Sequence, residues 1–421
     1  MGLWRGLRVA FILGSLFMIL LLLVYWDDVR GFSLHPLQDP KHGSPQAASC
    51  PLTTAGPSLS PSTARAQTSS SSTVPTNAFK TKLIPEKTRL EEQKQEDKRE
   101  QEEETREEDE EKGRSRTSVD VREQEARKQR IKDVCSGQDA VEFPGRTRPF
   151  EQIPNRELDH LIVDDTHQII YCYVPKVACT NWKRVMVILA QSLISPSTGK
   201  PYTDPKAVPP ELVHNSTLYL TFSKFWHHYG SLSRHLMALK LQHYTKFLFV
   251  RDPFVRLISA FRNKFGSPNQ EFYKQFGSVM LRRYGNVSGT LPETVAEAFA
   301  AGIKPTFEQF VEYLQDPETE QKSIFNEHWR QVYRLCHPCQ VGYDFIGRLE
   351  TLEPDAEHLL KLLKVDHLFH FPSGARNRTA ASWEQDWFAQ IPITMRRELY
   401  KLYEPDFELF GYPKPDSVLH Q

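Results

Sequence analysis

Several features that define common classes of protein are missing from this 421-residue sequence. It has no Gly-x-x-x-x-Gly-Lys-Ser/Thr segment, which argues against hydrolysis of ATP or GTP. Its six cysteines include one Cys-x-x-Cys pair, Cys336 and Cys339, and no second pair completes a tetrahedral zinc site. Charges of the two signs balance, with 53 Lys and Arg against 53 Asp and Glu. We expect neither a metal requirement nor a nucleic-acid partner.

The one long apolar run is Val9–Trp26. Eighteen helical residues span about 27 Å, which is enough for a thin bilayer. Arg5 and Arg8 precede the run, whereas Asp27 and Asp28 follow it, so the positive-inside rule places the rest of the chain in the lumen. A cleaved signal peptide is the alternative. It is disfavoured because the run is long and no small-x-small cleavage site follows it.

The next hundred residues have the composition of a stem. Residues 31–80 are rich in Ser, Thr and Pro, and residues 86–130 carry mixed charge without the apolar a and d positions of a coiled coil. Aromatic and aliphatic residues become frequent near Phe143. We therefore expect a cytosolic tail at 1–8, a transmembrane anchor at 9–26, a disordered lumenal stem at 27–140 and one catalytic domain at 141–421.

Two kinds of residue agree with a lumenal chain. Asn215, Asn286 and Asn377 each begin an Asn-x-Ser/Thr sequon for N-glycosylation. In an oxidising lumen some cysteines form disulfides. Cys336-His-Pro-Cys339 has the form of a redox motif, but a local disulfide or two separate structural disulfides are favoured. The spacing leaves the pairing open.

The domain alternates short apolar runs with helical patterns, which predicts an α/β fold with a mainly parallel sheet flanked by helices. The expected strands are Leu161–Val163, Ile169–Val174, Phe247–Val250 and Phe345–Ile346. The expected helices are Asn181–Leu193, Phe254–Phe265, Phe307–Leu314, Ala356–Leu363 and Met395–Tyr403.

Two of these segments share one plan, in which a strand leads through a basic turn into a helix with a single apolar stripe. They are Ile169–Leu193, with Lys176 in the turn, and Lys246–Phe265, with Arg251 in the turn. Each helix start offers free N–H groups and the positive end of the helix dipole, which suits an anion. Residues 171–283 contain 16 Lys and Arg against 4 Asp and Glu, a net charge of +12. We therefore predict a site for a ligand with two phosphates; two α/β units without a ligand, on an ordinarily charged surface, are the alternative.

The two turns, CYVPKVACTNWKRVM and KFLFVRDPFVRLISAF, resemble the cofactor motifs of the Golgi carbohydrate sulfotransferases. Further segments, including FNEHWRQVYRLCHPC, YDFIGRLETL and LYKLYEPDFELFGYPKP, are similar to those of the chondroitin 4-O-sulfotransferases within that family. The resemblance covers about residues 150–415. It implies a P-loop-like sulfotransferase domain that uses 3′-phosphoadenosine 5′-phosphosulfate.

The resemblance also implies separate roles for the two turns. One turn would hold the 5′-phosphosulfate, through Pro175, Lys176, Val177, Ala178, Cys179, Thr180 and Asn181. The other would hold the 3′-phosphate, through Arg251, Asp252, Pro253, Phe254, Val255, Arg256, Leu257, Ile258 and Ser259. Lys176 is placed to neutralise the negative charge that develops on the leaving phosphate.

Transfer to a hydroxyl also needs a general base. We favour His328, with Glu327, His214 and His235 as further candidates; a structural role for His328 is the alternative. The implied acceptor is the C4 hydroxyl of N-acetylgalactosamine in chondroitin or desulfated dermatan, in the Golgi lumen. Spare cations that could meet its uronate groups are Lys183, Arg184, Arg256, Arg262 and Lys264.

Two other functions fit parts of the sequence. A metal-dependent glycosyltransferase would share the anchor and stem, and Asp164-Asp165 at a strand end would be its metal-binding pair. Such an enzyme would need manganese and a nucleotide sugar. A lumenal glycan-binding protein would not need two basic turns at helix starts.

Overall fold

The computed structural model describes residues 121–420, except 139, 286, 288 and 373–380. The predicted anchor at 9–26, most of the predicted stem, Cys50, Asn286 and Asn377 lie outside the described residues. No helix of the described part is long and apolar enough to cross a membrane.

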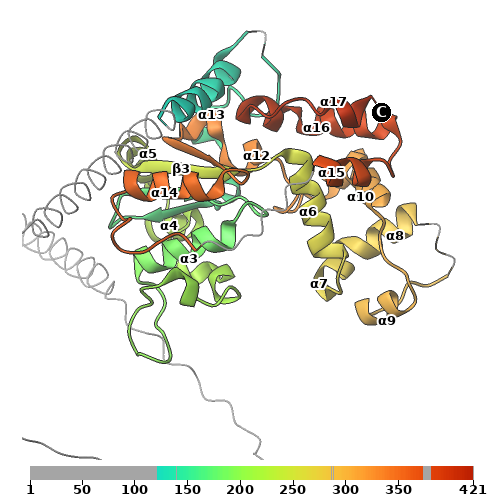
Figure 1. The fold of residues 1–421 in the computed structure, drawn as a ribbon, viewed down its shortest axis with the longest axis horizontal. Coiled ribbons are helices and arrows are strands. Elements are labelled where there is room, and N and C mark those ends of the chain that lie inside the picture. Colours follow the sequence, from blue (N-terminus) through green and yellow to red (C-terminus); the bar gives the residue numbers. More distant parts are fainter. Residues whose placement is uncertain (1–120, 139, 286, 288, 373–380, 421) are drawn as a thin grey trace, which may run out of the picture. The chain divides into compact units, whose positions relative to one another are not determined.

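A four-stranded sheet forms the centre of the domain, in the order β1-β2-β3-β4 (Figure 1). Its strands are Leu161–Asp164, Ile169–Cys172, Thr245–Val250 and Phe345–Arg348. The pairs β2–β3 and β3–β4 are parallel, as expected, but β1 and β2 form an antiparallel hairpin. The sheet is therefore mixed, because only four residues connect β1 to β2, and a connection so short cannot return the chain in the same direction.

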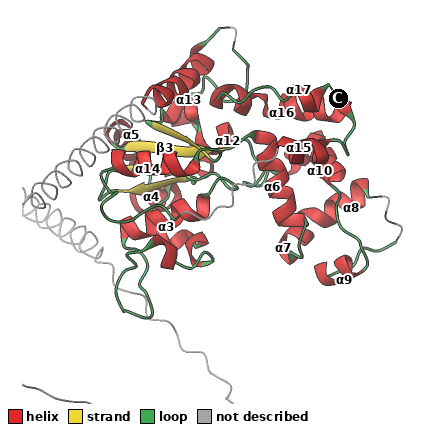
Figure 2. Ribbon diagram, in the orientation of Figure 1, coloured by secondary structure: helices red, strands yellow, loops and turns green. Residues whose placement is uncertain are grey.

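Helices surround this sheet and also extend to one side of it, where α6 to α9 lie together (Figures 1 and 2). All the predicted helices are present. The longer helices are α3 Cys179–Ala190, α4 Phe222–Tyr229, α5 Leu232–His243, α6 Pro253–Phe265, α8 Ser278–Tyr284, α10 Phe307–Gln315, α14 Leu352–Leu362, α15 Ala381–Phe388 and α16 Ile393–Phe410. The short ones are α7 Gln270–Phe272, α9 Val295–Ala300, α11 Pro317–Lys322, α12 Val332–Cys336, α13 Pro338–Val341 and α17 Asp416–Leu419, with a π-helical turn at Tyr273–Gly277.

Aromatic side chains fill one face of the sheet. Trp182 of α3 packs against Phe247 and Phe249 of β3, with ring centroids 4.9 and 4.8 Å apart. Phe249 in turn lies over Gly347 of β4, where an added Cβ would meet the ring at 2.2 Å. Glycine at position 347 thus allows the aromatic layer to reach the edge strand.

The edge of β4 is covered by a helix at residues 121–136, which lies within the segment predicted as stem. The amide of Gln124 bonds both the N–H and the carbonyl of Ile346, as a neighbouring strand would do. Arg127 also donates to the Ile346 carbonyl and pairs with Asp355 at 2.9 Å. The packed domain therefore includes residues from Gln124 onward, 17 residues before the boundary expected at 141.

Two disulfides, Cys135–Cys339 and Cys172–Cys336, bind distant segments together. Of the two favoured alternatives, two separate structural disulfides are confirmed. A local disulfide between Cys336 and Cys339 and a redox role for this motif are both wrong, because each of its cysteines pairs elsewhere. Cys179 is a free thiol at the start of α3. The first disulfide fixes the end of the 121–136 helix to α13, and the second fixes β2 to α12.

Candidate active site

The two basic turns lie side by side at the carboxyl edge of the parallel strands. β2 and β3 are hydrogen-bonded neighbours, so the turns that follow them emerge at the same edge. Arg251 Nη1 donates to the Lys176 carbonyl at 3.3 Å, which joins the turns directly. The structure thus brings together the two cations on which the prediction of a bisphosphate site rested.

The first turn has an unusual backbone. Lys176 and Ala178 have φ angles of +71° and +52°, in the left-handed region that glycine usually occupies. Ala178 is the N-cap of α3 and accepts hydrogen bonds from the N–H groups of Asn181 and Trp182. A turn of this kind directs successive N–H groups into a concavity that suits an anion. The sequence lacks glycine here, so this geometry was not foreseen.

Lys176 carries an ammonium in a cationic environment. Burial lowers its pKa to about 8, and the charges of Lys264, Arg251 and Arg256 act in the same direction. Removal from water and like-charge repulsion both penalise the protonated form. An arriving anion would relieve this repulsion, so the turn favours a negatively charged ligand.

The second turn is fixed by a helix cap. Asp252 accepts hydrogen bonds from the N–H groups of Phe254 and Val255, both at 2.9 Å, and Pro253 begins α6. Burial raises the pKa of Asp252 to about 6. Glu350, just after β4, accepts from the Asp252 N–H at 3.1 Å. This cap orients the turn that carries Arg251.

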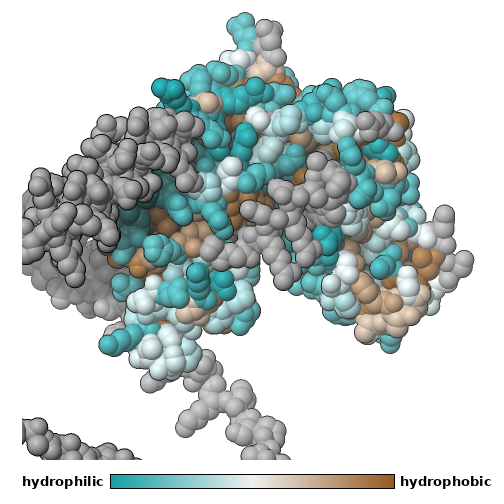
Figure 3. Space-filling model, viewed as in Figure 1, coloured by the Kyte–Doolittle hydropathy of each residue, from teal (hydrophilic) through white to brown (hydrophobic). Residues whose placement is uncertain are grey.

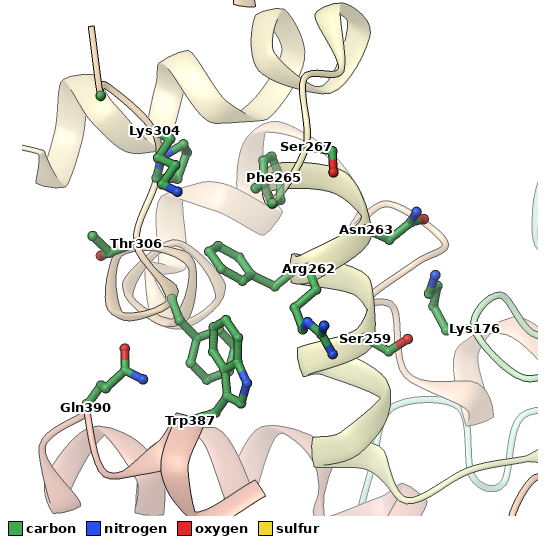
Figure 4. Close-up of a pocket in the computed structure, with 15 residues that line it drawn as sticks. Lys176, Ser259, Arg262, Asn263, Phe265, Ser267, Lys304, Thr306, Trp387 and Gln390 are labelled. Atoms are coloured by element: carbon green, nitrogen blue, oxygen red, sulfur yellow. The ribbon is translucent and has the colours of Figure 1, made fainter. Parts of the chain in front are cut away.

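A pocket of about 760 Å³ opens beside these turns, between α6, the 302–307 segment and α15. Lys176 and Ser259 line it where it meets the first turn, and Trp387 lines its opposite side (Figure 4). Its other lining residues are Phe261, Arg262, Asn263, Phe265, Gly266, Ser267, Gly302, Lys304, Pro305, Thr306, Phe307 and Gln390. A mixture of aromatic rings, hydroxyls and cations suits a ligand with both flat apolar and anionic parts.

Arg256 has a different role from the one predicted. Its guanidinium is 1% exposed and donates to three main-chain carbonyls, those of Pro175, Glu327 and Arg330, at 3.1, 2.9 and 2.7 Å. Since its donors are directed at the protein, Arg256 is no spare cation for a ligand. It ties the first turn and the 325–330 loop to α6.

Other residues of the two motifs form the frame of the site. The side chains of Val177, Phe254, Leu257 and Ile258 are fully buried in the core. Asn181 donates to the Pro372 carbonyl at 2.9 Å. These residues hold the turns in place, whereas Lys176, Thr180, Arg251 and Ser259 remain as side chains suited to contact a ligand.

His328 lies next to this site, in the loop tied down by Arg256. Asn326 Oδ1 accepts from the His328 N–H at 3.1 Å and lies 2.7 Å from His328 Nδ1. Because the main-chain N–H can only donate, the Asn326 atom is an acceptor, and His328 Nδ1 must carry the proton. Nε2 is then the unprotonated nitrogen. Burial and the charges of Lys264 and Lys176 lower the pKa of His328 to about 2, so the ring is neutral.

Of the other candidate bases, Glu327 and His214 lie near the site, whereas His235 does not. Glu327 accepts from the Tyr173 hydroxyl at 3.3 Å and lies 3.6 Å from His160 Nε2. His214 Nε2 lies 3.3 Å from Thr180 Oγ1, at the first turn. His235 is exposed on α5, where its neighbour Arg234 bonds the N-terminal segment of the domain. The structure thus brings Glu327 and His214 toward the site.

The acidic pair Asp164-Asp165 lies at the opposite edge of the sheet, where β1 ends at Asp164 and the turn to β2 begins. Asp164 accepts from the Thr166 N–H at 2.9 Å and pairs with His167 at 2.8 Å, and Asp165 pairs with Lys240. Within the part of the chain that is described, no group of three or more His, Cys, Asp or Glu could hold a metal. The pair stabilises a turn and is remote from the basic turns.

Comparison with known proteins identifies relatives over most of the chain. The model of the sulfotransferase family matches residues 159–413. Carbohydrate sulfotransferase 12 of Xenopus laevis is 49% identical over 97% of both chains. Carbohydrate sulfotransferase 12 of Mus musculus is 60% identical over 71% of this chain and 70% of its own, and carbohydrate sulfotransferase 11 of Rattus norvegicus is 38% identical over 69% and 76%. No solved structure matches.

Proposed function

This chain belongs to the sulfotransferase family and is a carbohydrate sulfotransferase, and we propose that its acceptor is the C4 hydroxyl of N-acetylgalactosamine in chondroitin, with desulfated dermatan as a second polymer. The observation that carries the proposal is the joined pair of basic turns, in which Arg251 bonds the carbonyl of Lys176. The choice of acceptor rests on the segments that resemble those of the chondroitin 4-O-sulfotransferases.

The donor of the family, 3′-phosphoadenosine 5′-phosphosulfate, carries anionic groups at both ends of one adenosine. Its phosphosulfate would meet Lys176, Thr180 and the N–H groups at the start of α3. Its 3′-phosphate would meet Arg251 and Ser259, and the pocket lined by Trp387 offers aromatic surface for the purine. One ligand would therefore use both turns, which explains why they adjoin.

Sulfate transfer requires the acceptor oxygen to attack sulfur while the bond from sulfur to the phosphate oxygen breaks. The Lys176 ammonium stabilises the charge that builds on the leaving phosphate. The acceptor proton passes to His328 Nε2, which is unprotonated because Asn326 holds the proton on Nδ1. The anionic donor offsets the cations that depress the pKa of His328, and so makes the ring a stronger base in the ternary complex.

We also propose that the enzyme is a single-pass type II protein of the Golgi membrane with its catalytic domain in the lumen. The apolar run at 9–26 and the charges on either side of it support this orientation. Asn215 supports a lumenal location, because its sequon is exposed in a turn where Asn215 Oδ1 accepts from Thr217. The two disulfides suit an oxidising compartment.

The test is to incubate the full-length protein in detergent with ³⁵S-labelled donor and a panel of desulfated glycosaminoglycans, then digest the products to disaccharides. We expect label on the 4-position of N-acetylgalactosamine, and the same rate when a metal chelator is present. Label confined to the 6-position or to heparan would refute the acceptor assignment. Loss of activity in chelator, together with use of a nucleotide sugar, would instead support the glycosyltransferase.

A further inference from the structure

We propose that Lys183 of α3, together with Lys264 of α6, binds the carboxylate of the uronic acid next to the reacting galactosamine, and so selects an acidic acceptor. This inference rests on the proposed function, because it presupposes an acceptor with alternating uronic acids. The sequence suggested five cations that could bind the uronate groups, and we assign this role to two of them.

The ammonium of Lys183 is nearly buried and has only aromatic partners. Lys183 is 8% exposed, and its Nζ lies 3.7 Å from the centroid of the Tyr173 ring and 5.6 Å from that of Tyr219. Among the described residues, no oxygen forms a hydrogen bond or ion pair with this ammonium. Burial lowers the pKa of Lys183, which reflects the cost of holding the charge there. Glu327 acts on the charge of Lys183 without forming a hydrogen bond or ion pair with it, so the donors of this ammonium are available to an anion that arrives from outside.

Lys264 approaches the same space from α6. Its Nζ lies 4.1 Å from the centroid of the Phe272 ring. The charges of Lys183 and Lys264 both act on His214, which borders the first turn, and both interact with Glu327. The molecular surface is hollowed between the part over α3 and the part over α7 and α9 (Figure 3). Lys183 on α3 and Lys264 on α6 thus act on the same two residues of the site, His214 and Glu327.

The other spare cations are already engaged. Arg256 donates to three carbonyls, and Arg184 donates to the Val208 carbonyl at 2.8 Å. Arg262 lines the pocket assigned to the donor. Of the five, Lys183 and Lys264 thus remain as the cations that lie outside this pocket and form no hydrogen bond or ion pair through their ammonium groups with the described residues.

Lys183 is also separate from the residues assigned to the donor. It lies four residues after Cys179, the first residue of α3, which places it about 6 Å farther along the helix axis. The phosphosulfate would be held by the N–H groups at the helix start, whereas the Lys183 ammonium lies over the Tyr173 ring, 3.7 Å from its centroid. A carboxylate bound by this ammonium would belong to the sugar next to the one that carries the acceptor hydroxyl. Glu327 repels that carboxylate, but Lys176, Lys183 and Lys264 outweigh its single charge.

The test compares chondroitin with carboxyl-reduced chondroitin, whose uronic acids are neutral, for the wild type, Lys183→Met and Lys264→Met. For Lys183→Met we expect a KM for chondroitin about 10- to 100-fold higher, since a desolvated charged hydrogen bond is lost. The KM for the reduced polymer should change by less than about threefold, and kcat by a similarly small factor. Lys264 is less buried, so Lys264→Met should show the same selectivity with a smaller increase.

Lys240→Met is the matched control, because the Lys240 ammonium also lies over an aromatic ring, 4.9 Å from the Tyr244 centroid, but pairs with Asp165 at the other edge of the sheet. If Lys183→Met raised both KM values equally, or lowered kcat alone, the proposal would be wrong. Should Lys183→Met fail to fold, Lys264→Met decides by the same comparison. If the wild type sulfated neither polymer, the proposed acceptor would fail independently of either lysine.

Discussion

Replacement of Arg256 by methionine should weaken the connection between the donor turn and the loop that carries His328, and should lower the stability of the protein. The guanidinium holds the carbonyls of Pro175, Glu327 and Arg330, and thereby fixes the donor turn and the loop of His328 to one helix. Methionine replaces only the aliphatic part of the arginine side chain and leaves three buried acceptors without a donor, at about 1–3 kcal/mol each. Because some carbonyls can rotate toward other donors or water, we expect the free energy of unfolding to fall by about 4 kcal/mol.

The assay is urea denaturation followed by tryptophan fluorescence, together with calorimetric titration of adenosine 3′,5′-bisphosphate. Donor affinity should fall with stability, because the turn of Lys176 loses its support. Arg256→Lys should recover little, since an ammonium cannot reach three separated carbonyls. Arg130→Met is the control, because Arg130 bonds Glu408 at the surface, and it should cost no more than about 1 kcal/mol. If Arg256→Met unfolded within about 1 kcal/mol of the wild type, or bound the bisphosphate equally well, the reasoning would fail.

Three further predictions concern the turn, the pH profile and a disulfide. Ala178→Gly should raise the free energy of unfolding by about 1 kcal/mol in the same urea assay, because φ is +52° at this position; a less stable variant would contradict a strained turn. The kcat/KM for the donor should fall as pH rises through about 8, where Lys176 loses its proton, and Lys176→Arg should move that decline to higher pH; an unmoved decline would exclude Lys176 as its source. Replacing Cys135 and Cys339 with serine should lower stability by about 4 kcal/mol, because with the Cys172–Cys336 disulfide intact their bond closes a loop of about 40 residues; an unchanged urea midpoint would show that the cross-link is dispensable.

Hydrophobic periodicity was sufficient to predict the main elements. The apolar stripe from Phe254 to Phe265 predicted α6, and the short apolar runs predicted all four strands. The direction of β1 could not be read in this way, because an apolar run carries no information about its pairing. The 121–136 helix was assigned to the stem because its polar residues dominate, yet Gln124 and Arg127 are the side chains that bind it to the sheet.

The site was only partly predictable. Lys176, Arg251 and Ser259 were identified from their places after two strands, and they do come together. The orientation of Arg256 was not predicted, because its role depends on carbonyls that are distant in the sequence. The left-handed backbone of Ala178 was missed because alanine gives no signal for it. Asn326 was missed because its role depends on the orientation of the His328 ring.

The attachment of the 121–136 helix determines how the domain carries mechanical load. A pull on the chain ahead of residue 121 acts first on the contacts of Gln124 and Arg127 with the edge of β4. If these give way, the helix peels off only as far as Cys135, where the covalent link to Cys339 takes the force. The strands and both turns lie beyond that link in the sequence. Tension from the N-terminal side would therefore be borne first by the 121–136 helix and one disulfide, before it reached the strands and the two turns.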